Sequence, residues 1–159
     1  MKTKNLFPLL LVIILSLSAC NRNFTRNGGG SAEVETTITQ QELQDTINAS
    51  IADPLIQELT VSLQQGYILV SGTRERLNDS SITDTLSFRL DLGVSNGQLS
   101  STISNAQFDG FTVEQNRLDL WNTTIANRIT RLAQKSPNTT LKSVSITTSS
   151  VTMIWTVTK

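Results

Sequence analysis

The side chains that most often perform catalysis are scarce in this chain. It contains no histidine and a single cysteine, which leaves no residues for histidine-based proton transfer, for the common nucleophile pairs or for the usual zinc sites. Two acids across a cleft would suffice for glycoside hydrolysis, and Asp79 with Asp84 or Asp109 with Glu114 are the candidate pairs. All four stand beside expected turns among polar residues, which favours solvated loop acids. We therefore expect no enzyme activity, no metal and no cofactor.

The single cysteine, Cys20, ends a segment that is typical of an export signal. Lys2 and Lys4 precede an almost wholly aliphatic run from Leu6 to Leu17, and small residues stand just before the cysteine. A run of about 12 residues is too short to span roughly 30 Å of hydrocarbon as a helix. The tetrapeptide Leu17-Ser18-Ala19-Cys20 resembles the lipobox of bacterial lipoproteins.

This resemblance implies that the leader, residues 1–19, is removed and that a diacylglyceryl group is attached to the thiol of Cys20. Two acyl chains, such as palmitate, hold a protein stably at a membrane, whereas one chain gives only reversible binding. The expected location is the bacterial cell envelope, with the protein anchored through its N-terminal lipid and its domain on the extracytoplasmic side. The alternative is an ordinary secretory signal that is cleaved near a cysteine.

Composition divides the rest of the chain into a tether and one domain. Residues 20–37 comprise the cysteine and an Asn- and Gly-rich stretch, which predicts a flexible tether. Residues 38–159 suit a single globular domain. The chain has 13 basic and 13 acidic residues without a basic block, so nucleic acid is not an expected partner.

The first half of the domain predicts one helix and one hairpin. Thr39 and Glu42 form a capping box, and Leu43, Ile47 and Ile51 follow on one helical face. Pro54 then discourages continuation of the helix. Residues 59–64 and 67–72 read as two strands that are joined by a turn at residues 65–66.

The second half predicts another hairpin, a longer helix and two final strands. Residues 86–94 alternate strictly between apolar and polar, and Asn96-Gly97 is a strong signal for a tight turn. A helix is expected from about Asn116 to Lys135, followed by strands around Val144 and from Val151 onward. The predicted order is α-β-β-β-β-α-β-β.

Each half of this order has a helix that leads into a hairpin, and Val61 and Leu63 align with Val144 and Ile146. The order and the repeat resemble small envelope lipoproteins of the tubular lipid-binding superfamily. That resemblance implies an α+β fold in a single domain. In it, one curved antiparallel sheet of about six strands packs on two helices and leaves an apolar groove beside the long helix.

The leading functional expectation is a lipid or another apolar ligand bound between the sheet and the long helix. Eight large side chains on predicted inward faces are the candidates for lining this site, with a dry packed core as the alternative for each of them: Phe88, Leu90, Leu92, Trp121, Ile125, Ile129, Met153 and Trp155.

The alternative functional expectation is a structural or assembly lipoprotein that binds another envelope protein through its sheet surface or an edge strand. The Ser- and Thr-rich final strands, residues 139–159, are the candidate edge, and Thr152 and Thr156 are expected to point outward there.

Overall fold

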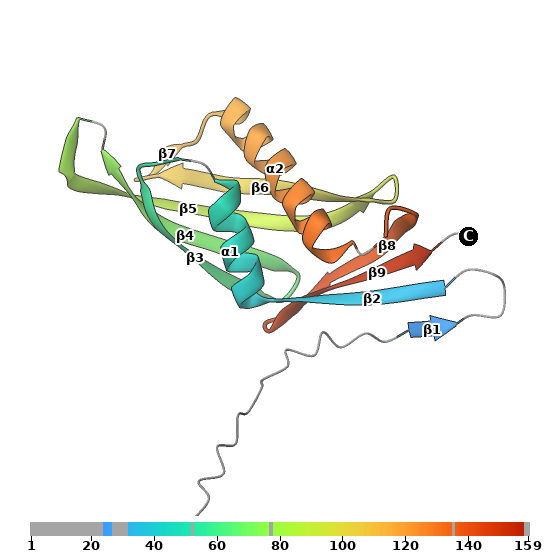
Figure 1. Ribbon diagram of the computed structural model, residues 1–159. Coiled ribbons are helices and arrows are strands. Elements are labelled where there is room, and N and C mark those ends of the chain that lie inside the picture. The colour runs from blue at the N-terminus through green and yellow to red at the C-terminus, as the bar shows by residue number, and fades with distance from the viewer. Residues whose placement is uncertain (1–23, 27–31, 52, 77, 135, 158–159) are drawn as a thin grey trace, which may run out of the picture.

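The computed structural model describes residues 24–26, 32–51, 53–76, 78–134 and 136–157, and its elements are shown in Figure 1. Cys20, the leader and the rest of the expected tether outside these ranges lie beyond the described residues. In chain order, the elements are β1 (Phe24–Arg26), β2 (Ala32–Thr39), α1 (Gln40–Ser50), β3 (Ile56–Gln64), β4 (Tyr67–Arg76), β5 (Asp79–Ser95), β6 (Gln98–Phe108), β7 (Phe111–Thr112), α2 (Gln115–Ala133), β8 (Thr139–Ile146) and β9 (Ser150–Val157).

These elements form a mixed α+β fold with two antiparallel sheets. The larger sheet has the strand order β3-β4-β5-β6-β7, and the smaller sheet has the order β1-β2-β9-β8. Both helices lie over the same face of the larger sheet, which we call the helix-side face (Figure 1). The α+β class is confirmed, and the expected order appears once β1, β2 and β7 are set aside. The expectation of one sheet of about six strands is wrong, because the final hairpin belongs to a separate sheet.

The two sheets meet where hairpin turns of the larger sheet reach β8. The Gly66 amide donates to the Ile146 carbonyl at 3.0 Å, and the Leu141 amide donates to the Gly97 carbonyl at 2.8 Å. Both glycines have positive φ, 87° and 74°, as tight turns at these positions require. The turns of the larger sheet therefore hydrogen-bond to β8, and the larger sheet does not continue into the smaller sheet.

The start of α1 follows the sequence expectation closely. The Glu42 amide donates to Thr39 Oγ1 at 3.3 Å, and the Glu42 carboxylate accepts from the Thr39 amide at 2.9 Å. The predicted capping box is thus confirmed, and Leu43 and Ile47 on the expected face are buried. The long helix α2 spans Gln115–Ala133, close to its expected bounds, and its apolar stripe of Leu118, Trp121, Ile125 and Ile129 is buried.

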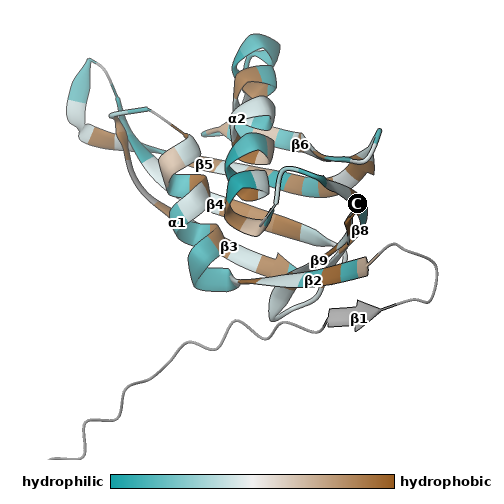
Figure 2. Ribbon diagram, turned by 45° about the vertical axis from the view of Figure 1, so that its right-hand side comes forward, coloured by the Kyte–Doolittle hydropathy of each residue, from teal (hydrophilic) through white to brown (hydrophobic). Residues whose placement is uncertain are grey.

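Residues 32–37, which we expected in the tether, form most of β2. All eight residues of β2 pair with β9, from Ala32 opposite Val157 to Thr39 opposite Ser150. Hydrophobic and hydrophilic bands alternate along this strand (Figure 2), and Trp155 Nε1 donates to Thr36 Oγ1 at 3.0 Å. The expectation of an irregular segment is wrong for residues 24–26 and 32–37, because β2 and β9 supply the ladder partners that composition alone does not reveal.

Each helix also caps one edge of the larger sheet with an amide side chain. Gln44 of α1 accepts from the Val61 amide at 2.6 Å and donates to the Leu59 carbonyl, both on edge strand β3. Asn122 of α2 accepts from the Ile103 amide at 2.8 Å on β6, in a part of β6 that lies before its pairing with β7 at Gln107 and Phe108. These side chains satisfy backbone groups that would otherwise be open to another strand.

Candidate functional site

The eight predicted ligand-lining residues all pack in the core between the helices and the sheets. Leu92 is half-buried against this core, and the other seven are at most 4% exposed. Trp121 lies at their centre, with its ring 6.0 Å from Phe88 and 6.4 Å from Phe108 between centroids. The predicted inward orientation is therefore confirmed, whereas a ligand-lining role for these residues stays a prediction.

The expected edge at residues 139–159 is only partly an edge in the structure. Strand β9 lies between β2 and β8 and is paired on both sides, and Thr152 and Thr156 on it are half-buried. Strand β8 is the outer strand of this hairpin, and the two turns of the larger sheet meet it near its ends. Thr152 and Thr156 lie on the face of β9 opposite to the buried Met153 and Trp155, as expected, but β9 itself is not an edge strand, because β2 pairs with its other side.

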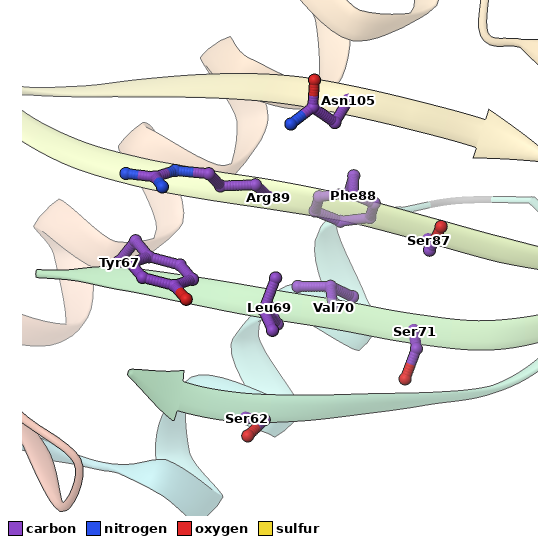
Figure 3. Close-up of a pocket in the computed structure, with 9 residues that line it drawn as sticks. All are labelled: Ser62, Tyr67, Leu69, Val70, Ser71, Ser87, Phe88, Arg89 and Asn105. Atoms are coloured by element: carbon purple, nitrogen blue, oxygen red, sulfur yellow. The ribbon is translucent and has the colours of Figure 1, made fainter. Parts of the chain in front are cut away.

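A pocket of about 500 Å³ lies on the opposite side of the larger sheet, on the face that no helix covers in Figure 1. We call this the outer face. Its lining residues come from the four neighbouring strands β3, β4, β5 and β6, and Figure 3 shows them spread across the sheet with the helices behind. They are Ser62, Tyr67, Leu69, Val70, Ser71, Ser87, Phe88, Arg89 and Asn105. Phe88 is the one predicted residue that also borders a described pocket, although it is 2% exposed and its ring packs against Trp121 on the other side of the sheet.

Tyr67 and Arg89 form one end of the pocket, and Arg89 is also ion-paired with Asp91. The Arg89 guanidinium lies 4.1 Å from the centroid of the Tyr67 ring, within the range of a cation–π contact. Arg89 also binds Asp91 through two hydrogen bonds, Nε to Oδ2 at 2.8 Å and Nη2 to Oδ1 at 2.6 Å. The hydrogen bond from Arg89 lowers the pKa of the Asp91 carboxyl. At neutral pH Arg89 and Asp91 therefore form an ion pair without net charge.

The other end of the pocket depends on a β-bulge in β6. Ser87 pairs with Gln107, and Arg89 pairs with Ser104, so Asn105 and Ala106 both stand opposite Phe88. Ala106 is 4% exposed and points into the core, whereas Asn105 is exposed and has φ 53°. Positive φ is uncommon for a residue other than glycine, and bulges often re-aim a side chain. Here the bulge directs the Asn105 amide to the outer face.

Short polar side chains surround the apolar part of the pocket. Ser62 Oγ accepts a hydrogen bond from Gln64 Nε2 at 3.0 Å. Within the described residues, the side chains of Ser71, Ser87 and Asn105 make no hydrogen bond. Their hydroxyl and amide groups can both donate and accept. Leu69, 42% exposed, adds apolar surface among them.

The sequence contains a signal for this pocket that we did not use. The run Ile68-Leu69-Val70 places one leucine on the face of β4 that should be polar. The bulge has a signal too, because the buried residues Ile103 and Ala106 are three positions apart where strict alternation allows two or four. Both signals are breaks in an alternating pattern.

Three of the four acids that we considered for catalysis bind a cation or a polar group of the fold, whereas Glu114 is the N-cap residue of α2 and makes no side-chain capping bond. Asp84 and Asp109 both contact Arg76, at 2.6 Å and 3.3 Å. Asp79 accepts from the Ser81 hydroxyl at 2.6 Å, which lowers the pKa of its carboxyl. A raised pKa would suit a general acid, so this direction agrees with a structural role for Asp79.

Another hollow, of about 390 Å³, lies between α1 and α2. It is lined by Asp45, Thr46, Ala49, Arg128, Arg131 and Leu132. We take the outer-face pocket as the candidate site, because the bulge at Asn105 is a second and independent feature that shapes it.

Among the described residues, no group of three or more histidine, cysteine or acidic side chains is placed to hold a metal ion. No helix in the described ranges is long and apolar enough to cross a membrane. A scan against models of known protein families finds no match, and searches of curated proteins and of solved structures also find none.

Proposed function

We propose that this chain is a membrane-anchored lipoprotein of the bacterial cell envelope that acts by binding, without catalysis, through the outer face of its larger sheet. The anchor is the diacylglyceryl group that the lipobox resemblance implies at Cys20. The observation that carries the proposal is the contrast between the two faces. The helix-side face is closed by the core, whereas the outer face holds a pocket of about 500 Å³.

The size and lining of the pocket fit a binding site. Ligand pockets are concave, measure roughly 300–1,000 Å³ and combine apolar surface with a few placed polar groups. Here Tyr67 and Leu69 supply apolar surface, and Ser71, Ser87 and Asn105 supply polar groups with no side-chain partner in the described ranges. All of them stand on strands, which hold side chains more firmly than loops do.

Partner binding by strand addition has less support than binding to this face. Gln44 and Asn122 occupy backbone groups at both edges of the larger sheet. Two turns occupy part of the β8 edge in the same way. A strand added at these places would have to displace hydrogen bonds that already exist.

The expectation of a lipid between the sheet and the long helix remains a second proposal that rests on the resemblance. It requires the core around Trp121 to open, because this residue is 4% exposed. Native mass spectrometry of the full chain, followed by organic extraction, tests it directly. A stoichiometric lipid that survives purification would support the proposal, and a clean unliganded mass after incubation with lipid would contradict it.

The outer-face proposal is tested by photo-crosslinking in the native envelope. A benzophenone amino acid is placed at Leu69, and the matched control carries it at Leu120, which is 64% exposed on α2. We expect a discrete adduct from position 69 and none from position 120. Equal labelling at the two positions, or no adduct at position 69, would refute the outer face as the binding surface.

A further inference from the structure

We propose that the ligand of the outer-face pocket is a neutral carbohydrate chain. This inference rests on the proposed function, since it takes the outer face as the binding surface. Three properties of the pocket lead to it: its lack of net charge, its small polar groups that both donate and accept hydrogen bonds, and the exposed apolar surface that lies among them.

The charge of the pocket excludes the usual basis for binding an anion. Arg89 is the one charged side chain among the nine lining residues, and it is already held by Asp91 through two hydrogen bonds and by the Tyr67 ring. Bidentate pairs between arginine and a carboxylate are among the stronger polar contacts in proteins. A phosphate or carboxylate ligand that binds the remaining guanidinium donors would lie close to the Asp91 carboxylate and be repelled by it. A neutral ligand leaves the pair intact.

The polar groups of the pocket match the groups of a sugar. Each sugar hydroxyl both donates and accepts a hydrogen bond, as do the hydroxyls of Ser71 and Ser87, and the Asn105 amide also offers both functions. These side chains come from β4, β5 and β6. Neighbouring strands lie about 4.8 Å apart, so the groups are distributed across the sheet and can contact successive rings of one chain.

The apolar part of the pocket is suited to the carbon–hydrogen faces of sugar rings. Leu69 presents a side chain that is 42% exposed, beside the half-buried Tyr67. Acyl chains are a poorer fit, because four of the nine lining side chains are serine or asparagine and would lose hydrogen bonds to water beneath a lipid. An extended peptide is also disfavoured, because a sheet face offers no backbone groups for strand addition.

The test uses the full chain, purified in detergent, and isothermal titration calorimetry. The neutral probes are chitohexaose, cellohexaose and maltohexaose, and the charged comparators are a hexamer of galacturonic acid and vesicles of phosphatidylglycerol. We expect at least one neutral hexamer to bind with an affinity that changes less than twofold between low and high salt, because no net charge is neutralised.

Two variants locate the binding. Asn105→Gly removes the amide and keeps a residue that accepts positive φ, and Ser87→Ala removes one hydroxyl. Each should weaken binding of the neutral hexamer about fivefold to tenfold, the usual effect of losing one hydrogen bond. The matched control is Ser95→Ala, an exposed serine on the same strand that lies outside the pocket lining, and it should bind as the unaltered protein does.

Several results would overturn the proposal. They are the absence of binding to all three neutral hexamers, tighter binding of the galacturonic acid hexamer or the vesicles, and equal loss of affinity in the Ser95→Ala control. The crosslinking experiment at Leu69 separates this failure from failure of the proposed function. An adduct identified there as protein or lipid refutes the carbohydrate and retains the outer face, whereas the absence of any adduct refutes both.

Discussion

Replacing Gln44 with leucine should destabilise the fold by more than its half-exposed position suggests. The Gln44 amide completes the edge of β3 by accepting from the Val61 amide and donating to the Leu59 carbonyl. Leucine keeps most of the volume of the side chain and removes both hydrogen bonds. Leu59 and Val61 are 2% and 1% exposed, so their freed backbone groups have poor access to water.

The expected cost follows from these two groups. A hydrogen bond contributes about 0.5–1.5 kcal/mol net, and a buried group left without a partner costs about 1–3 kcal/mol. For two bonds at a partly covered edge we expect a loss of about 2–4 kcal/mol in the free energy of unfolding. In a domain of this size, that lowers the melting temperature by on the order of 10 °C.

Urea denaturation followed by circular dichroism measures this loss, with Gln41→Leu as the matched control. Gln41 is exposed on the same helix, and among the described residues its amide hydrogen-bonds Asp45 alone, at 3.0 Å, so the control should change stability by less than about 0.5 kcal/mol. A second variant, Gln44→Glu, keeps an acceptor for Val61 and loses the donor to Leu59. It should regain stability relative to the unaltered protein below about pH 5, as the carboxyl becomes protonated and can donate.

Equal denaturation midpoints for Gln44→Leu and Gln41→Leu would refute this account of the edge. In that case, packing of α1 alone would hold β3 in place. An unchanged pH dependence in Gln44→Glu would refute the directional part of the argument, namely that the Leu59 carbonyl needs a donor.

Two further changes test other contacts of the fold. Gly97→Ala should lower the free energy of unfolding by about 2–4 kcal/mol, because the new Cβ would lie 2.4 Å from Thr140 Cγ2 in a backbone with φ +74°. Gly66→Ala should lower it by only about 1–2 kcal/mol, because Gly66 has φ +87° and no atom lies within 4 Å of the new Cβ. Equal urea midpoints for the two variants would contradict this difference. Burial raises the pKa of Asp53, but its hydrogen bonds, including that from Arg74, lower it more, so the pKa lies below 3.8. The stability from this depressed pKa is therefore fully present above pH 3.8 and lost as the pH falls through the folded-state value. Asp53→Asn should flatten the pH dependence of the urea midpoint below about pH 4. An unchanged slope would show that the ion pair between Asp53 and Arg74 does not contribute to stability.

Local patterns in the sequence predicted the local structure well. The capping box at Thr39, the turn at Asn96-Gly97 and the apolar stripe of α2 all depend on residues a few positions apart. Their physical causes, hydrogen bonds at a helix end, a preference for positive φ and helical periodicity, act over the same short range. These features could therefore be predicted from the chain without knowledge of its partners.

The division into two sheets could not be predicted in this way. Strands β3 and β9 both alternate with a period of two, and that pattern states which face is buried without stating which strand lies beside it. β2 was missed for the same reason, since its pairing with β9 joins residues more than 100 positions apart. The candidate site was missed because the ligand-lining candidates were chosen only among inward residues, while Leu69 and Asn105 interrupt the alternation on the outward side.

The inclusion of β1 and β2 in the smaller sheet sets how far the domain can stand from a membrane. If Cys20 carries the proposed lipid, only residues 21–23 separate the anchor from β1, which pairs with β2, and chain geometry limits their span to at most about 14 Å. A tether that reached residue 37 would have allowed about 60 Å. The shorter reach confines the domain to a layer not much thicker than itself. It would then meet its ligand by lateral diffusion in two dimensions, and a pull on the anchor would load the three residue pairs between β1 and β2 before it loads the eight pairs between β2 and β9.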